Sequence, residues 1–207
     1  VNHVLKLKNM EHDLPGILDR VTEKTRLVFL DNPNNPCGTA INPPALYKFL
    51  SDMPEHVLVV LDEAYVDFTD DEFKVDIYSL ISNCKNRCGV VSMRTFSKAY
   101  GLAGARVGFG LMVPEVAACL HKVRQPFNIN KMALAGAEAA LADKEFYERT
   151  IRLTGEGKQF LMDGITRLGC SSCPSQTNFF LIDVKGDATM LYESMLKKGV
   201  IVRSMKA

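Results

Sequence analysis

The sequence predicts an α/β fold with a mostly parallel sheet, helices on both faces of that sheet, and a smaller C-terminal α+β domain. Short apolar runs alternate with helix-like segments over residues 1–143. These runs are nearly continuous in apolar residues, which is typical of strands buried on both faces of a parallel sheet. From Lys144 onward the pattern changes to one long helical period, followed by a strand, a helix and a short strand. This change indicates that a second domain follows the sheet.

Strands and helices alternate along the first part of the chain. The predicted strands are Val4–Leu7, Leu27–Leu30, Val57–Leu61, Gly89–Met93 and Arg106–Leu111. The predicted helices are Leu14–Lys24, Pro43–Met53, Asp76–Ile81, Pro114–Lys122 and Lys131–Ala142. Asn42 as a cap, followed by Pro43 or Pro44 in the first turn, is a typical helix start.

A long helix is predicted in the second part, because apolar residues between Tyr147 and Leu168 recur at helical spacing over about seven turns. The elements that follow it are a strand at Phe179–Val184, a helix at Ala188–Lys198 and a short strand at Val200–Arg203. We therefore expect residues 1–145 to be part of a large domain and residues 146–207 to be part of a small one. The boundary would fall within the long helix rather than in a flexible linker.

Composition favours a globular enzyme over several other classes of protein. With 207 residues, of which 47% are hydrophobic and 24% charged, the chain can bury a sizeable core. A net charge of +1 without a dense run of Lys and Arg argues against nucleic acid or an anionic membrane as a partner. No apolar stretch approaches the roughly 20 residues that span a bilayer. The start at Val1 has no secretory signal, so we expect a cytoplasmic protein whose given sequence begins inside a longer chain.

Residues 95–106 contain the most informative motif, a lysine flanked by two hydroxyl side chains and followed by an arginine. Such a set suits an aldehyde that also carries a phosphate. The amine of Lys98 can form a Schiff base with the aldehyde carbon. The hydroxyls of Thr95 and Ser97 can bind the phosphate together with Arg106, whose guanidinium can bind two oxygens at once. Pyridoxal phosphate (PLP) carries both groups, although a single lysine in such a stretch is more often a solvated surface charge.

Two further polar motifs each follow a short apolar run. The segment Asn32–Gly38 comes after the strand predicted at Leu27–Leu30, and the segment Asp62–Tyr65 comes after the strand predicted at Val57–Leu61. In open α/β sheets, ligands bind outside the carboxyl ends of the strands. We therefore expect these segments to meet the lysine motif in one crevice.

The three motifs, in this order, resemble the large domain of the fold-type-I PLP-dependent aminotransferases. Residues 94–104 and 125–130 resemble the class II histidinol-phosphate aminotransferase family in particular. The resemblance implies the PLP-transferase fold of type I and a homodimer with shared active sites. It also implies a role in histidine biosynthesis, in which an amino group passes from L-histidinol phosphate to 2-oxoglutarate by way of pyridoxamine phosphate. The partners implied are an amino donor and a 2-oxo acid acceptor.

The resemblance also assigns roles to single residues. Lys98 would hold PLP and then move a proton at the substrate α-carbon. Asp62 would stabilise the protonated pyridine nitrogen, since strand alternation turns Glu63 toward the other face. Asn35 and Tyr65 would contact the phenolate oxygen of PLP, and Asn35 would also lie against the substrate.

The cofactor phosphate would be bound by Thr95, Ser97 and Arg106, and the phosphate of the substrate by Arg203. The family's arginine for the substrate carboxylate would lie beyond Ala207. Its glycine-rich phosphate loop, its ring-stacking aromatic residue and its N-terminal arm would lie upstream of Val1. Because both ends of the family pattern are missing, we expect this chain alone to be inactive.

Other readings remain open. An aromatic aminotransferase or a phosphothreonine decarboxylase of the same fold would use the same lysine, and a catalytically silent fragment or binding module would keep only the fold. A zinc-stabilised interaction domain would need the close cysteine pairs Cys84/Cys88 and Cys170/Cys173 as ligands. Cysteines in a protein without a secretory signal are usually reduced and act as small hydrophobic residues, so we expect no metal.

Overall fold

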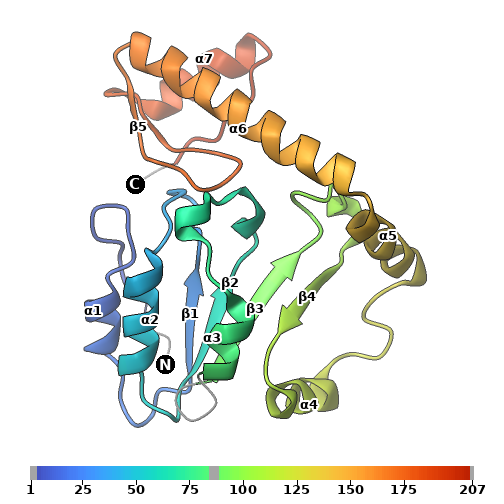
Figure 1. Cartoon of the computed structure of the whole chain (residues 1–207). Helices are drawn as coiled ribbons and strands as arrows, with labels where there is room; N and C mark the ends of the chain where they lie inside the picture. Colours follow the sequence, from blue (N-terminus) through green and yellow to red (C-terminus); the bar gives the residue numbers. More distant parts are fainter. Residues whose placement is uncertain (1–3, 84–88, 206–207) are drawn as a thin grey trace.

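Aliphatic residues form a four-stranded sheet in the order β1-β2-β3-β4. The computed structural model describes residues 4–83 and 89–205 (Figure 1). Strands β1, β2 and β3 are parallel, and β4 is antiparallel to β3. The strands are β1 (Leu27–Asp31), β2 (Leu58–Asp62), β3 (Gly89–Thr95) and β4 (Gly108–Leu111). The prediction of a mostly parallel sheet is confirmed.

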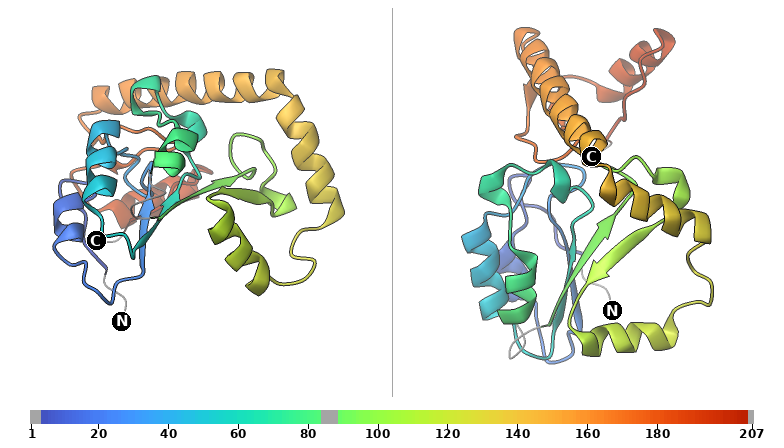
Figure 2. Two further views of the ribbon diagram at one scale, coloured as in Figure 1. Left: turned by 60° about the horizontal axis from the view of Figure 1, so that its bottom comes forward. Right: turned by 45° about the vertical axis from the view of Figure 1, so that its right-hand side comes forward.

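Three helices cover one face of this sheet and form the main core with it (Figure 1). Leu46, Phe49 and Leu50 of α2 are almost fully buried, because they pack against strand residues such as Val59 and Val90. Two further helices, α4 and α5, lie beyond β4 (Figure 2). These helices are α1 (Leu14–Leu18), α2 (Pro43–Asp52), α3 (Ile77–Asn83), α4 (Pro114–Val123) and α5 (Lys131–Ala142).

The long helix α6 (Lys144–Arg167) is continuous through Gly155 and Gly157, as predicted. Its first turn is capped by Asp143, whose carboxylate accepts a hydrogen bond from the backbone N–H of Phe146 at 3.0 Å. It runs across the top of the sheet, above the carboxyl ends of the strands (Figure 1). The antiparallel pair of β5 (Ser171–Ser172) and β6 (Ile182–Asp183) and the helix α7 (Ala188–Lys197) follow it. Among the described residues, no helix is long and apolar enough to cross a membrane.

Several predicted elements are shorter than expected, each for a local reason. The helix predicted at Leu14–Lys24 ends at Leu18, because the chain then makes a turn in which the N–H of Thr25 bonds the carbonyl of Thr22 at 2.9 Å. The strand predicted from Arg106 begins at Gly108, because Arg106 has a φ of 57° and cannot join a ladder. Three short 3-10 helices, Val66–Phe68, Asp71–Phe73 and Ala103–Ala105, were not predicted.

Three predicted strands lack the expected pairing. Val4–Leu7 joins no sheet, and the only pairing near it is an isolated bridge between Lys8 and Glu11 within the described chain. Val200–Arg203 is not a strand, because its backbone joins no ladder and its side chains are exposed. The strand predicted at Phe179–Val184 is reduced to β6, since β5 offers it only two partners. Apolar composition alone could not reveal whether a partner strand was available.

Asp31, the last residue of β1, fixes the turn that follows it. Its carboxylate accepts hydrogen bonds from the Asn34 side chain at 3.0 Å and from the backbone N–H of Asn35 at 2.8 Å. His12 also lies 2.9 Å from the Asp31 carboxylate. Burial raises the pKa of Asp31, but these hydrogen bonds outweigh it and hold the pKa below its usual value. Burial likewise lowers the pKa of His12, yet the hydrogen bonds and charge of Asp31 hold it above 6.5.

The ion pair between His12 and Asp31 predicts a loss of stability with rising pH. Protonated His12 stabilises the fold fully below the unfolded-state pKa of about 6.5, and that contribution is lost as the pH rises through the raised folded-state pKa. We expect wild-type protein to exceed a His12→Gln variant in unfolding free energy at about pH 5.5 and to lose that advantage at about pH 8.5. Asp31 stays ionised throughout, because its pKa is lowered from 3.8. Urea unfolding at both pH values measures the difference, and an equal advantage at both would contradict the assignment.

Candidate active site

Polar side chains gather in a hollow at the carboxyl ends of β2 and β3. Its volume is about 360 Å³, within the range of about 300–1,000 Å³ that small-molecule sites occupy. Five of the predicted site residues line it together with Arg94, which the sequence did not single out. The lining residues are Asp62, Ala64, Met93, Arg94, Thr95, Ser97, Lys98 and Arg106.

The carboxylates of Asp62 and Glu63 go to different surroundings, as strand alternation predicted. Asp62 lines the hollow, and its Oδ1 accepts a hydrogen bond from the backbone N–H of Ala64 at 3.1 Å. Glu63 is buried, with 4% of its surface exposed. Its Oε2 accepts hydrogen bonds from the Ser92 hydroxyl and from Nε of Arg94, the latter at 3.0 Å. The Glu63 charge is therefore neutralised inside the protein, whereas Asp62 remains available to a ligand.

Lys98 stands on a tight turn directly after β3. The backbone N–H of Gly101 donates to the Lys98 carbonyl at 3.0 Å, and Gly101 has a φ of 70°, which glycine adopts without strain. Phe96 anchors the turn from below, since it is 4% exposed and packs in a small cluster that includes Val107. The Lys98 side chain is exposed in the hollow, with Nζ 5.1 Å from the centre of the Tyr65 ring.

An anion could bind beside this lysine. Thr95 Oγ1 accepts a hydrogen bond from the backbone N–H of Ser97 at 3.0 Å, so its own proton remains free to be donated. Arg106 donates one hydrogen bond to the Ala103 carbonyl at 2.8 Å and lines the same hollow. Two hydroxyls and a guanidinium are the donors that a phosphate group requires.

Asn35 and Tyr65 meet at the rim of the site. The amide nitrogen of Asn35 donates to the Tyr65 hydroxyl oxygen at 3.0 Å. The Phe179 ring packs edge-on against the Tyr65 ring, with centres 5.0 Å apart. The Asn35 loop thus reaches the hollow through Tyr65. Arg203, in contrast, is exposed, does not line the hollow, and makes no side-chain hydrogen bond or ion pair with any described residue.

A segment after β5 holds the C-terminal part against the loops of the site. The Gln176 side chain accepts a hydrogen bond from the backbone N–H of Asp70 at 2.7 Å and donates to the Asp70 carboxylate at 2.8 Å. Its backbone N–H donates to the carbonyl of Gly38 at 2.7 Å. Lys158 of α6 supports the segment by donating to the carbonyls of Ser175 and Thr177. Pairing between such distant residues left no signal in the sequence.

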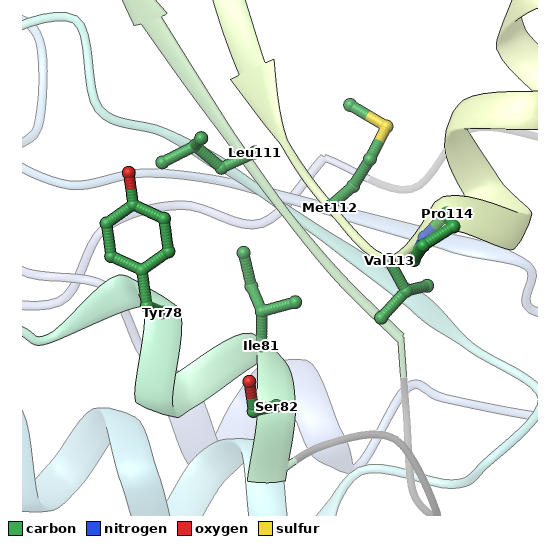
Figure 3. A pocket seen from close by; sticks show the side chains of 7 residues that line it. All are labelled: Tyr78, Ile81, Ser82, Leu111, Met112, Val113 and Pro114. Carbon is green, nitrogen blue, oxygen red and sulfur yellow. The ribbon is translucent and has the colours of Figure 1, made fainter.

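A second hollow, of about 240 Å³, lies between α3 and the end of β4 (Figure 3). Figure 3 shows mostly apolar side chains around it, including those of Tyr78, Ile81 and Met112. No charged group among the described residues lines this hollow, so within that part of the chain it lacks the acid, base and anion-binding groups of the first one. We therefore assign the chemistry to the hollow around Lys98.

The cysteines give no sign of a metal centre in the part of the chain that the structure covers. No group of three or more His, Cys, Asp or Glu side chains lies close enough to hold a metal ion among residues 4–83 and 89–205. Cys170 and Cys173 are free thiols there. Cys84 and Cys88, the other predicted pair, lie outside the described residues.

The family profile for class I and II aminotransferases matches residues 2–207, and the chain belongs to this family. It is 60% identical to a histidinol-phosphate aminotransferase of Desulfotalea psychrophila, over 100% of this chain and 55% of that protein. A relative with the same name from Methylobacillus flagellatus is 48% identical, over 97% of this chain and 53% of its own length. The chain thus spans about half the length of these curated relatives.

Solved structures agree with the fold class predicted from the sequence. The histidinol-phosphate aminotransferase of Sinorhizobium meliloti in complex with pyridoxal-5'-phosphate matches with a TM-score of 0.90 and 32% identity, over 99% of this chain and 56% of that one. The L-threonine-O-3-phosphate decarboxylase of Porphyromonas gingivalis matches with a TM-score of 0.74 and 28% identity, over 89% and 56% of the two chains. The type-I fold of PLP-dependent transferases is confirmed.

The ion pair between buried Glu63 and half-buried Arg94 predicts a large effect on stability. An Arg94→Leu substitution leaves the Glu63 carboxylate buried without its cation, which costs about 3 kcal/mol of unfolding free energy. An added Glu63→Leu substitution removes the stranded charge and should restore part of that loss. Urea unfolding of both variants measures this difference. A double variant no more stable than Arg94→Leu would contradict the role given to the pair.

Proposed function

We propose that the protein is a PLP-dependent aminotransferase that exchanges an amino group between L-histidinol phosphate and 2-oxoglutarate. The products would be imidazole-acetol phosphate and L-glutamate. The observation that carries the proposal is the hollow that combines a lysine amine, a carboxylate and a phosphate-binding set. The name of the relative that is 60% identical over the whole of this chain supports the same activity.

The donor groups of the hollow fit the groups of PLP. Lys98 would hold the aldehyde carbon, and Thr95, Ser97 and Arg106 would bind the phosphate. The Asp62 carboxylate would pair with the ring nitrogen. The Tyr65 hydroxyl accepts its hydrogen bond from Asn35, so its own proton is free to be donated to the ring's phenolate oxygen. When bound, PLP acts as an electron sink that makes the substrate α-carbon acidic.

The residues of this chain would then do three things. Once the substrate amine has displaced it, the Lys98 amine would take the proton from the substrate α-carbon and return it to the cofactor carbon that carried the aldehyde, as a general acid and base. Asp62 would keep the ring nitrogen protonated through an ion pair. Asn35 would lie against the substrate, whose phosphate Arg203 would bind, and orient the reacting bond.

The finer properties of the whole protein belong to the same proposal. Residues 1–145 would be part of a large domain that binds the cofactor, and residues 146–207 part of a small domain that contributes Arg203. A cytoplasmic homodimer would complete the site. The similarity to the L-threonine-O-3-phosphate decarboxylase of Porphyromonas gingivalis supports a second candidate function. In that case the protein would be a decarboxylase that uses the same lysine and the same phosphate-binding residues.

A lysine substitution tests the assignment of the cofactor site. Lys98→Ala in the full-length protein should abolish transamination and the covalent attachment of PLP, because no other amine of the described residues lines the hollow. PLP is added, bound PLP is fixed with borohydride, and the modified peptide is identified by mass spectrometry. Lys122→Ala, on the exposed surface of α4, is the matched control and should behave as wild type. Normal turnover of Lys98→Ala would sink the proposal.

An arginine substitution tests the choice of substrate. Arg203→Ala should raise KM for L-histidinol phosphate by about ten- to a hundredfold, the effect of losing a hydrogen bond between charged groups. KM for an aromatic amino acid should change little, and Arg167→Ala at the exposed end of α6 provides the control. Equal losses on both donors would point to an aromatic aminotransferase. Release of carbon dioxide from a phosphorylated amino acid would instead identify a decarboxylase.

A further inference from the structure

One tyrosine near the start of α6 contacts both of the loops that carry the candidate site. The Tyr147 hydroxyl donates a hydrogen bond to Oδ1 of Asp67 at 3.0 Å. Asp67 stands in the short 3-10 helix at Val66–Phe68, directly after Tyr65. The Tyr147 ring also lies against the Tyr100 ring, with centres 5.1 Å apart. Tyr100 is two residues after Lys98, so one side chain joins the lysine turn to the segment that begins at Asp62.

The hydrogen bond is held in a partly buried, charged environment. Burial raises the pKa of Asp67, an effect that the Tyr147 hydrogen bond and the charges of Arg94 and Lys74 offset only in part. Burial and the charge of Asp67 raise the pKa of Tyr147 well above its usual value of 10. Tyr147 therefore remains a protonated donor at neutral pH. The hydrogen bond between Tyr147 and Asp67 is therefore stronger than one between two neutral, solvent-exposed groups.

Aromatic packing holds the lysine turn against the same part of α6. The Tyr100 ring, which packs against Tyr147, also contacts Phe96, with centres 5.0 Å apart. Phe96 is the buried anchor of the turn. On the other side, a Cβ atom at Gly101 would come within 3.2 Å of the Phe146 ring, so the turn already lies close to α6. The turn has little room to move while Tyr147 stays in place.

We propose that Tyr147 is a positioning residue that sets the distance between Lys98 and Asp62. The two groups stand on different loops, and a ligand that uses both needs their spacing held to within about 0.5 Å. Tyr147 fixes it by bonding to the loop of Asp62 and packing on the loop of Lys98. The inference rests on the proposed function, because it assumes that one PLP molecule contacts both groups.

Four single variants of the full-length protein, and the double variant that combines Tyr147→Phe with Asp67→Ala, test this role. Tyr147→Phe and Asp67→Ala each remove the hydrogen bond, while Asp67→Asn keeps an oxygen that can accept it. Tyr78→Phe makes the same chemical change on α3, where the Tyr78 side chain is 70% exposed. The first measurement is the dissociation constant for PLP, followed by visible absorbance. The second is hydrogen exchange of residues 96–102 without PLP, with α2 as the internal reference.

Tyr147→Phe and Asp67→Ala should each weaken PLP binding by about tenfold, as expected for a lost hydrogen bond to a charged group. The double variant should be no worse than either single one, because both substitutions remove the same bond. Asp67→Asn should stay within about threefold of wild type, since the acceptor is retained. Tyr78→Phe should bind PLP as wild type does. Residues 96–102 should exchange faster in Tyr147→Phe while exchange of α2 is unchanged.

The two measurements separate this inference from the proposed function. If wild-type protein takes up no PLP on Lys98, the proposed function fails, but the exchange experiment still decides the role of Tyr147. If residues 96–102 exchange no faster in Tyr147→Phe than in wild type, or if exchange of α2 increases by the same factor, Tyr147 does not position the turn and the inference is overturned. An Asp67→Asn variant that loses as much affinity as Asp67→Ala would overturn it as well.

Discussion

The parallel register of β1, β2 and β3 is the constraint on which the rest of the molecule depends. The parallel register pairs Asp31 with Asp62, and Asp62 with Met93, so β1 and β2 end at one level and β3 runs only two residues further, to Thr95. The loops after these strands therefore begin side by side, although long stretches of sequence separate them. The ion pair between Glu63 and Arg94 continues the β2–β3 contact beyond the ladder. The polar side chains of these loops therefore meet at the carboxyl ends of the strands, where the hollow around Lys98 lies.

The sequence predicted helices well, because the hydrogen bonds and caps of a helix come from residues close to one another in the chain. The bounds of α5 were predicted residue for residue, because its pattern starts after Asn130, whose side chain accepts a hydrogen bond from the Ala133 N–H at 2.7 Å. Strands need a partner that the sequence does not specify. Val4–Leu7 and Val200–Arg203 have suitable composition but join no ladder, and so they are not strands. The division into domains at residue 145 stays a prediction.

The site was predictable to the extent that its groups lie in short motifs at strand ends. Asp62, Lys98 and Arg106 line the hollow because each motif places its polar side chain at the end of a strand or in the turn that follows one. Arg94 was missed, since its partner Glu63 follows a different strand, β2, and lies far from it in the sequence. Phe179 was missed for the same reason, because its packing on Tyr65 joins residues more than a hundred positions apart. The role of Arg203 stays a prediction, as its side chain lies on the surface.

The junction between α5 and α6 makes the position of the C-terminal part depend on the packing of a few small side chains under α5. Asp143 both ends α5 and caps α6, so the direction of α6 is inherited from α5. In turn, α5 rests on the cluster around Phe96 through Ala133 and Ala137, which are nearly fully buried. At 1.5 Å per residue, the 24 residues of α6 form a rod about 36 Å long. A tilt of about 5° at the junction would therefore move its far end by about 3 Å. A side chain larger by one methylene at Ala133 or Ala137 would tilt α5, and the resulting tilt of α6 would displace residues at its far end.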